Sequence, residues 1–191
     1  DKEQITDYDD FQEALADNLI TIGYDDTVAD AMAQLISHSV SAQLPILVTS
    51  NEDEIAKCIA AMYGTDVSVV NIGLGMNAAD YIPIVENKSD NMVILVNGAF
   101  SGFSLEHFNA IRYHFANAGY VVLFSLDGAD TSLIPKTVYE KAMFLDSSCG
   151  YSFPTGEELT CYSVHYSIFI KAYSKEELCK QKKKLNNQLL H

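Results

Sequence analysis

The chain has 191 residues, 48% of them hydrophobic and 20% charged, and 26 acidic against 12 basic residues give a formal net charge of −14. This length and composition exclude a disordered chain and indicate one domain with a substantial core, or one domain with a small appendage. No apolar run approaches the roughly 20 residues that cross a bilayer. The negative charge repels phosphate backbones and anionic lipid, so we expect no nucleic-acid partner and no membrane partner.

The four cysteines are widely separated and form no C-x-x-C pair. Cys58, Cys149, Cys161 and Cys179 lack the usual spacing of zinc ligands, so no metal site is expected. A chain of this size does not need disulfides to fold, and we expect reduced thiols in a cytoplasmic protein, with a Cys149–Cys161 disulfide as the alternative. The first residues do not resemble a signal peptide, and we expect the chain to be part of a larger protein or complex.

Two helices are expected before the first strand. Apolar residues recur at helical spacing from Asp9 to Leu19, and Gly23 ends this stripe. Thr27 is then expected to cap a second helix that runs through Ile36. We assign residues 1–43 to these N-terminal helices, packed on the core that follows.

From residue 44 onward, short apolar strands alternate with amphipathic helices. The expected strands are 45–49, 67–72, 92–96, 120–124 and 142–145. The expected helices are 50–64, 78–82, 104–118 and 135–141, the second stopped by Pro83, and the third capped by Ser104 and ended by Gly119. Continuous apolar strands of this kind belong to a parallel sheet that helices cover on both sides. The fold class is therefore α/β, with a three-layer, mainly parallel, P-loop-NTPase-like sheet of five strands over residues 44–146.

Residues 147–191 form a different pattern, which predicts a loop, an edge strand and a C-terminal helix. Residues 147–158 are rich in Ser, Gly and Pro, as loops are. From Tyr162 to Ile170 apolar and polar residues alternate, which indicates an edge or hairpin strand with one wet face. Ser174-x-x-Glu177 is a capping box for a last helix. The lysines at 180–184 lie at the end of that helix and are interpreted as a solvated terminus rather than a nucleic-acid site.

The first strand leads directly into a helix, where a phosphate-binding loop would lie in this kind of sheet. Such a loop needs glycines, a lysine and a hydroxyl for magnesium. Residues 48–55, Val-Thr-Ser-Asn-Glu-Asp-Glu-Ile, contain neither glycine nor lysine, and their three carboxylates repel phosphate. We therefore expect this helix end to be unfit for a nucleotide.

The order of the elements resembles the AAA+ ATPase fold, especially the branch of methylation-dependent restriction GTPases and MoxR-like proteins. Gly23-Tyr-Asp-Asp before strand 44–48 resembles the approach to a Walker A strand. Strand 92–96 is similar to a Walker B strand, and Phe124–Gly128 to the end of a sensor-1 strand. Residues 133–146 resemble the Leu-Pro segment before the fifth strand of that family. The resemblance covers roughly residues 20–146 and lies in pattern and spacing.

The catalytic positions that the resemblance implies are not filled in this chain. The Walker B Asp-Glu would fall on Asn97 and Gly98, which leaves neither a magnesium ligand nor a base. The arginine finger would lie near residues 136–141, where only lysines occur, and Arg112, the only arginine, lies in the preceding helix. Lysine cannot reproduce the bidentate fork of arginine. We therefore assign no catalytic residue and no cofactor, and we do not expect nucleotide hydrolysis.

A competing motif is Gly73-x-Gly75-x-x-Ala78, which follows a strand and precedes a helix as a dinucleotide fingerprint does. The strand after it ends in Asn97 instead of an acid that would bind a ribose, and Pro83 is expected to cut its helix short. We interpret Gly73 and Gly75 as a tight strand exit, and keep cofactor binding at Gly73, Gly75 and Ala78 as the alternative.

The sequence contains no complete hydrolase motif. Ser104 and Ser152 approach a G-x-S-x-G elbow without completing it, and Ser104 is expected to cap a helix instead. His107 and His114 are interpreted as helix-surface residues, and His165 has no recognisable acid or nucleophile. Asp127 and Asp130 follow a strand, where function is often found, but Asp-Gly is also ordinary turn chemistry.

These patterns predict a catalytically inactive AAA+-like module that serves protein–protein assembly or regulation. Its expected partner is another protein, a neighbouring domain, or further copies in a homo- or hetero-oligomer. The alternative is a small α/β enzyme or a dinucleotide- or nucleotide-binding domain that uses the Gly73–Ala78 turn.

Overall fold

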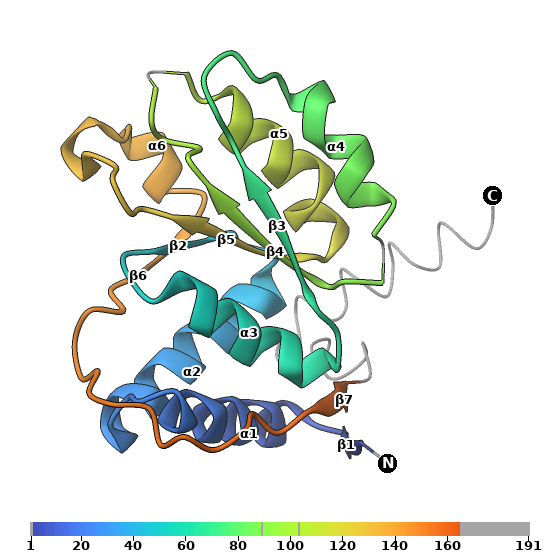
Figure 1. The fold of residues 1–191 in the computed structure, drawn as a ribbon, viewed down its shortest axis with the longest axis vertical. Helices are drawn as coiled ribbons and strands as arrows, with labels where there is room; N and C mark the ends of the chain where they lie inside the picture. The colour runs from blue at the N-terminus through green and yellow to red at the C-terminus, as the bar shows by residue number, and fades with distance from the viewer. Residues whose placement is uncertain (1, 89, 103, 165–191) are drawn as a thin grey trace, which may run out of the picture.

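The computed structural model describes residues 2–88, 90–102 and 104–164 (Figure 1). Its main sheet has five strands, all parallel, in the order β3-β4-β5-β2-β6. The strands are β2 (Ile46–Val48), β3 (Val67–Asn71), β4 (Val93–Asn97), β5 (Val121–Ser125) and β6 (Met143–Leu145). The predicted fold class and the five expected strands are confirmed.

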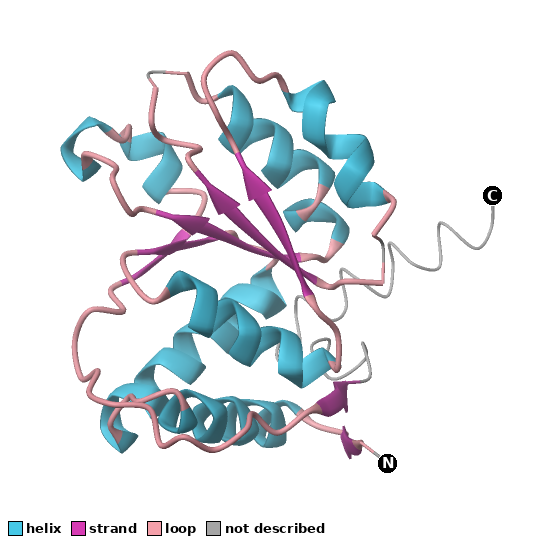
Figure 2. Cartoon of the chain, in the orientation of Figure 1, coloured by secondary structure: helices cyan, strands magenta, loops and turns pink. Residues whose placement is uncertain are grey.

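Helices cover both faces of this sheet and make three layers (Figure 2). On one face lie α1 (Tyr8–Thr21), α2 (Asp26–Ala42) and α3 (Glu52–Tyr63). On the other lie α4 (Ala78–Glu86), α5 (Glu106–His114) and α6 (Lys136–Tyr139). The N-terminal helices share their apolar cluster with the sheet, so residues before the first strand of the sheet belong to its core.

The central strands are apolar on both faces because they serve two cores. In β4, Val93 and Leu95 pack with the cluster of α1, α2 and α3, whereas Ile94 and Val96 pack with the cluster of α4 and α5. All four side chains are fully buried. This is the burial that the uninterrupted apolar run 92–96 predicts for a central parallel strand.

The second helix begins earlier and ends later than expected. Asp25, not Thr27, is its N-cap, because the Asp25 carboxylate accepts a hydrogen bond from Val28 N (2.9 Å). The helix continues past Ile36 to Ala42 and ends at Gln43, whose φ of 56° is left-handed. The apolar face on which the prediction rests ends at Ile36, but Ser37 and Ser39 beyond it are fully buried in the structure.

Pro83 does not stop its helix. Helix α4 runs from Ala78 to Glu86 and contains Pro83, whose carbonyl still accepts a hydrogen bond from Asn87 N (3.1 Å). Tyr81, Ile82 and Val85 are buried on the sheet. Their packing outweighs the cost of a helical proline, so this expectation was wrong.

The third expected helix is shorter than predicted and is followed by a separate 3₁₀ turn. Helix α5 starts at Glu106, whose N–H donates to Ser104 Oγ (3.1 Å), so Ser104 bonds to the helix start although Leu105 is the N-cap residue. The 3₁₀ turn η1 (Ala116–Ala118) follows, and Gly119 ends it with a φ of 97°.

The C-terminal strand lies in a second, two-stranded sheet, where it is an edge strand as predicted. Strand β7 (Tyr162–Val164) pairs in parallel with β1 (Glu3–Ile5), a strand that the sequence did not predict. Among the described residues, β7 therefore pairs with a distant parallel strand and not with a hairpin neighbour. Between β6 and β7 the chain runs along the α1 side of the molecule without helix or strand, as expected for residues 147–158 (Figure 1). The expected continuation to Ile170, His165, the capping box and the lysines at 180–184 lie outside the described residues.

The cysteines of the described residues agree with the expectation of reduced thiols. Cys58, Cys149 and Cys161 are free thiols, as expected, and Cys179 lies outside the described residues. Cys58 is buried, and burial raises the pKa of its thiol, so it is a packing residue rather than a nucleophile. Within the described ranges, no helix has both the length and the apolarity to cross a membrane.

Candidate functional site

The carboxyl ends of the five strands meet at one edge of the main sheet, the place where parallel α/β sheets bind ligands. In sheet order, this carboxyl edge is formed by the residues that end or follow the strands: Asn71, Asn97, Ser125, Thr49 and Asp146. The candidate phosphate-binding, dinucleotide and hydrolase motifs within the described residues can be placed relative to this edge.

The connection from β2 to α3 has only three residues, Thr49–Asn51. Asn51 makes the turn with a left-handed φ of 54°, and the first turn of α3 carries Glu52, Asp53 and Glu54. The Walker A pattern G-x-x-x-x-G-K-[ST] requires a much longer glycine-rich connection. This connection is too short to surround a phosphate, and the three carboxylates add Coulomb repulsion.

Ser147 closes the space beside this connection. It is fully buried, and its Oγ accepts a hydrogen bond from Ser50 N (2.9 Å) and donates to Ser50 O (2.5 Å). Ser147 N donates in turn to Thr49 Oγ1 (3.0 Å). These bonds fix Thr49 and Ser50, which follow β2, to Ser147, the second residue after β6, and they leave little space on this side of the carboxyl edge.

Tyr24 and Asn51 complete the closure. The Tyr24 hydroxyl donates to Ser147 O (2.6 Å) and accepts from Asn51 Nδ2 (3.0 Å). Tyr24 is buried, and burial raises the pKa of its phenol, which keeps it a hydrogen-bond donor at neutral pH. Sequence reasoning missed these two bonds because Tyr24 and Ser147 are 123 residues apart, and no motif links them.

A further hydrogen bond crosses between β5 and α3. Ser125 Oγ donates to Glu52 Oε1 (3.1 Å) and accepts from Asp127 N (3.2 Å). The chain after β2 goes to the α3 face, and the chain after β5 goes to the α6 face. Adjacent strands with opposite exits form the usual ligand crevice of an open α/β sheet. Here Glu52 and Ser125 bridge that crevice.

At the position that the AAA+ resemblance assigns to the Walker B carboxylates, the structure has a pair of amides. Asn97 ends β4, and its Nδ2 donates to Asn71 Oδ1 at the end of β3 (2.9 Å). Gly98 follows with a φ of 82° and passes close to the carbonyl oxygen of Ile72. Neutral amides bonded to each other provide no charge for a divalent cation.

The glycines of the competing motif do line a pocket. A cavity of about 160 Å³ lies at the ends of β3 and β4, and both Gly73 and Gly75 are among its walls. Ala78 is not: it is the first residue of α4 and packs against the apolar cluster beneath. The motif therefore splits into two pocket residues and one packing residue.

A second cavity of about 240 Å³ adjoins the first, and both contain Ser101 and Gly102 in their walls. It lies between the loops that follow β4 and β5. Its walls are mostly apolar, with Asp130 as the one carboxylate. Sequence reasoning did not identify this cavity, because its walls come from two loops without a common motif.

The candidate acid–base residues do not form a catalytic set. His114 lies 3.9 Å from Glu86 on the surface, and Ser152 donates to Gly23 O (3.2 Å). His107 is different: its Nδ1 is 2.8 Å from the Tyr81 hydroxyl, and it lines the glycine pocket. None of the described serines is hydrogen-bonded to a histidine, so no hydrolase dyad is assembled there.

The aspartates after β5 behave as turn residues. Asp130 accepts hydrogen bonds from Ser132 N (3.0 Å) and Ser132 Oγ (2.6 Å), and these bonds lower the pKa of its carboxyl. Asp127 donates its N–H to Ser125. In the part of the chain that the structure describes, no three His, Cys, Asp or Glu side chains are grouped to hold a metal ion.

Comparison with known proteins gives no relative for this chain. No protein-family model matches it, and searches of curated proteins and of solved structures find no match. The geometry of the carboxyl edge is therefore the basis on which a function can be proposed.

Proposed function

We propose that the chain is a catalytically inactive AAA+-like module that serves protein–protein assembly or regulation within a larger protein or complex. The strand order supports this proposal. The Walker A-like strand β2 lies between the sensor-1-like strand β5 and the last strand β6, with the Walker B-like strand β4 beyond β5. This is the order expected of an AAA+ core.

The observation that carries the loss of activity is the closed β2–α3 connection. Three residues join the strand to the helix, and Ser147, Tyr24 and Asn51 fill the adjoining space with hydrogen bonds. A bound polyphosphate would have to break these bonds and lie against Glu52, Asp53 and Glu54. Both requirements disfavour nucleotide binding.

Calorimetric titration with ATP and GTP in the presence of magnesium tests this part of the proposal. We expect no saturable heat at micromolar nucleotide. Saturable binding that disappears in Asn51→Gly or Asn97→Ala would overturn it, because those residues occupy the Walker positions. Glycine is chosen at Asn51 because it adopts the left-handed backbone found there without strain.

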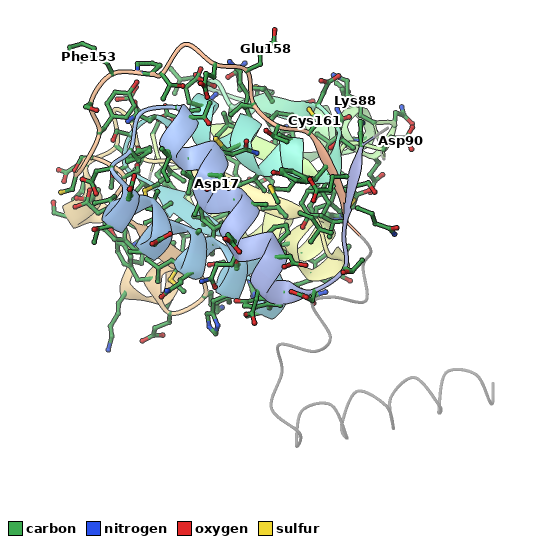
Figure 3. The ribbon with its side chains drawn as sticks, turned by 90° about the horizontal axis from the view of Figure 1, so that it is seen from below. Asp17, Lys88, Asp90, Phe153, Glu158 and Cys161 are labelled. Atoms are coloured by element: carbon green, nitrogen blue, oxygen red, sulfur yellow. The ribbon has the colours of Figure 1, made fainter. Side chains whose placement is uncertain are left out.

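An exposed aromatic residue supports the assembly role. Phe153 is 89% exposed, on a segment that is tied to the α1–α2 turn by Asp25 N to Gly150 O (2.9 Å) and Ser152 N to Gly23 O (2.8 Å). Figure 3 shows Phe153 and Glu158 projecting away from the body of the molecule. Aromatic residues are enriched among those that dominate protein contacts, so Phe153 is the proposed contact residue of this segment.

Sedimentation over a range of protein concentrations tests assembly between copies. If copies associate through this segment, Phe153→Ser weakens association, whereas Tyr113→Ser on exposed α5 leaves it unchanged. Monomeric behaviour of the unmodified chain at every concentration would exclude the homo-oligomer and restrict the proposal to a different protein partner.

The second candidate is a small α/β enzyme or dinucleotide-binding domain that uses the Gly73–Ala78 turn. The 160 Å³ pocket favours it. Two observations oppose a dinucleotide: the cavity is below the roughly 300–1,000 Å³ of drug-sized sites, and the Asp80 carboxylate already accepts from Asn77 N (2.7 Å) at the start of α4. A pyrophosphate would need that helix end.

A thermal-shift screen with NAD, NADP and S-adenosylmethionine separates the two candidates. A ligand at about one hundred times its Kd stabilises the folded state by about 2.7 kcal/mol. We expect no shift with any of these three, and a clear shift would favour the second candidate over the assembly module.

A further inference from the structure

Two glycines of this chain have no conformational reason to be glycine. The sequence contains ten glycines, and eight of them have a positive φ, which favours glycine over other residues. The remaining two, Gly73 and Gly102, are 29 residues apart in the sequence (102 minus 73) and line the same cavity.

Packing does not require these two glycines either. A Cβ at Gly73 would meet only Met76 Sδ at 3.8 Å, an ordinary contact, and a Cβ at Gly102 would meet nothing within 4 Å. Gly98 in the same wall contrasts with them, since its φ of 82° and the nearby Ile72 carbonyl both demand glycine. What Gly73 and Gly102 preserve is open space above the backbone.

The polar groups around this space are donors. Tyr81 is 4% exposed, and His107 Nδ1, at 2.8 Å, is the only hydrogen-bond partner of its hydroxyl among the described residues. Burial, with a contribution from the Glu106 charge, raises the pKa of Tyr81 to about 12, so the phenol remains protonated. Because the phenol proton needs an acceptor, Tyr81 donates to Nδ1, and the imidazole proton lies on Nε2.

The loops contribute further donors. Ser104 Oγ accepts from Glu106 N, so its own proton is free for a ligand. Within the described residues, the N–H groups of Gly75 and Gly102 make no hydrogen bond. Ile72, Leu74 and Met76 add apolar surface to the same walls. The pocket therefore combines apolar walls with several unpaired donors.

The charges around the pocket disfavour an anion. None of its lining residues is lysine, arginine, aspartate or glutamate. The nearest acids lie at its margins: Glu106 precedes His107, Asp80 is in the first turn of α4, and Asp130 lines the adjoining cavity. A charge of −14 for the whole chain adds to the repulsion of anions.

We propose that this pocket, between Gly73 and Gly102, binds a small uncharged heterocycle that carries carbonyl or ring-nitrogen acceptors. The ring lies against the backbone at the two glycines and the apolar side chains. The imidazole Nε2–H, the Ser104 hydroxyl and the loop N–H groups donate to its edge. A volume of about 160 Å³ suits a single ring system rather than a complete nucleotide.

Titration with uracil, adenine and nicotinamide, followed by amide NMR shifts, tests this inference. At least one of the three is expected to give saturable shifts at Gly75, Gly102 and His107. Gly73→Ala and Gly102→Ala should each weaken its binding by about tenfold without changing the melting temperature, because each adds a methyl group at a pocket-lining residue and neither methyl group meets a clash. Asn109→Ala, on the exposed surface of α5, should leave affinity unchanged.

Three outcomes would overturn the inference. They are the absence of saturable shifts with all three probes, an unchanged affinity in Gly102→Ala, and tighter binding of acetate than of any heterocycle. His107→Phe provides a second measure, since it keeps a ring while removing the Nε2–H donor and should also weaken binding. None of these results depends on the closed β2–α3 connection, so the inference and the proposed function fail separately.

Discussion

One side-chain amide holds the returning segment to the first helix. Asn18 is buried, its Nδ2 donates to Thr160 O (3.0 Å), and its Oδ1 accepts from Thr160 N (3.0 Å). The two bonds satisfy both backbone groups of a residue outside any helix or strand. Asn18 therefore supplies the backbone hydrogen bonds that a neighbouring strand would otherwise give to Thr160.

Asn18→Ala is expected to lower the free energy of unfolding by about 1–2 kcal/mol, because two hydrogen bonds to backbone groups are lost together. Urea denaturation measures this change. Asn109→Ala, which alters an exposed asparagine on α5, is the control and should change stability by less than about 0.5 kcal/mol. Equal stability of the two variants would show that Asn18 does not anchor the segment.

Tyr81 predicts a dependence of stability on alkaline pH. Its folded-state pKa of about 12 lies above the usual value of 10.0, so its contribution is fully present below pH 10 and is lost as the pH rises through 12. Two pKa units correspond to at most about 2.7 kcal/mol, and solvent screening reduces the expected loss to about 1–2 kcal/mol. Urea denaturation at a series of pH values gives the free energy of unfolding as a function of pH. Between pH 10 and 12 this free energy should fall more steeply for the unmodified chain than for Tyr81→Phe, and identical slopes would contradict the assignment.

At the residue scale, sequence reasoning identified which positions lack catalytic groups but not what replaced them. The absence of glycine and lysine after β2 is visible in the letters. The bonds from Tyr24 to Ser147 O and from Asn51 to Tyr24 are not, because they join residues whose proximity depends on the complete fold. The distinction between required and unrequired glycines also needs φ values that no sequence provides.

At the scale of elements, the exits of β3 and β4 depend on one crowded position. Gly98→Ala is expected to destabilise the fold by about 2 kcal/mol, since alanine would adopt a left-handed φ and also meet the Ile72 carbonyl. Thermal denaturation compares it with Gly102→Ala, which should be near neutral. Similar losses in both variants would show that the β4–α5 loop is tighter at Gly102 than the structure indicates.

The strands were predictable and the helix limits were not, for different reasons. A central parallel strand such as β4 is apolar at four consecutive positions, Val93 to Val96, and this signal depends on its own residues alone. Helix α4 runs through Pro83 because Tyr81, Ile82 and Val85 are buried on the sheet, an interaction that its local sequence does not encode. Strand β1 was missed because three residues with an unseen partner carry no periodicity.

At the scale of the whole molecule, the excess of acidic residues causes repulsion between carboxylates at the start of α1. The charge of Asp7, followed by slight burial and the charges of Asp9 and Glu3, raises the pKa of Asp10. An acid with a raised folded-state pKa loses stability as the pH rises through that pKa, so repulsion is present at neutral pH. Asp10→Asn is therefore expected to raise the melting temperature at low salt.

Two comparisons test this electrostatic interpretation by calorimetry. The gain in Asp10→Asn should shrink as salt is added, because salt screens repulsion between exposed charges. Asp130→Asn should shift the melting temperature the opposite way, since bonds from Ser132 lower the pKa of Asp130 and favour its ionised form. A gain in both variants would indicate a general effect of net charge rather than a local one.

The parallel pairing of β1 with β7 also determines when the small sheet can form during synthesis. Glu3 pairs with Tyr162, so almost the whole described chain must leave the ribosome before the first strand can find its partner. Helices α1 and α2 and strands β2 to β6 can assemble before then, whereas the contact between Asn18 and Thr160 must wait with β1. Because closing so long a loop comes late and costs chain entropy, the small sheet is the part of this fold expected to form last and to open first.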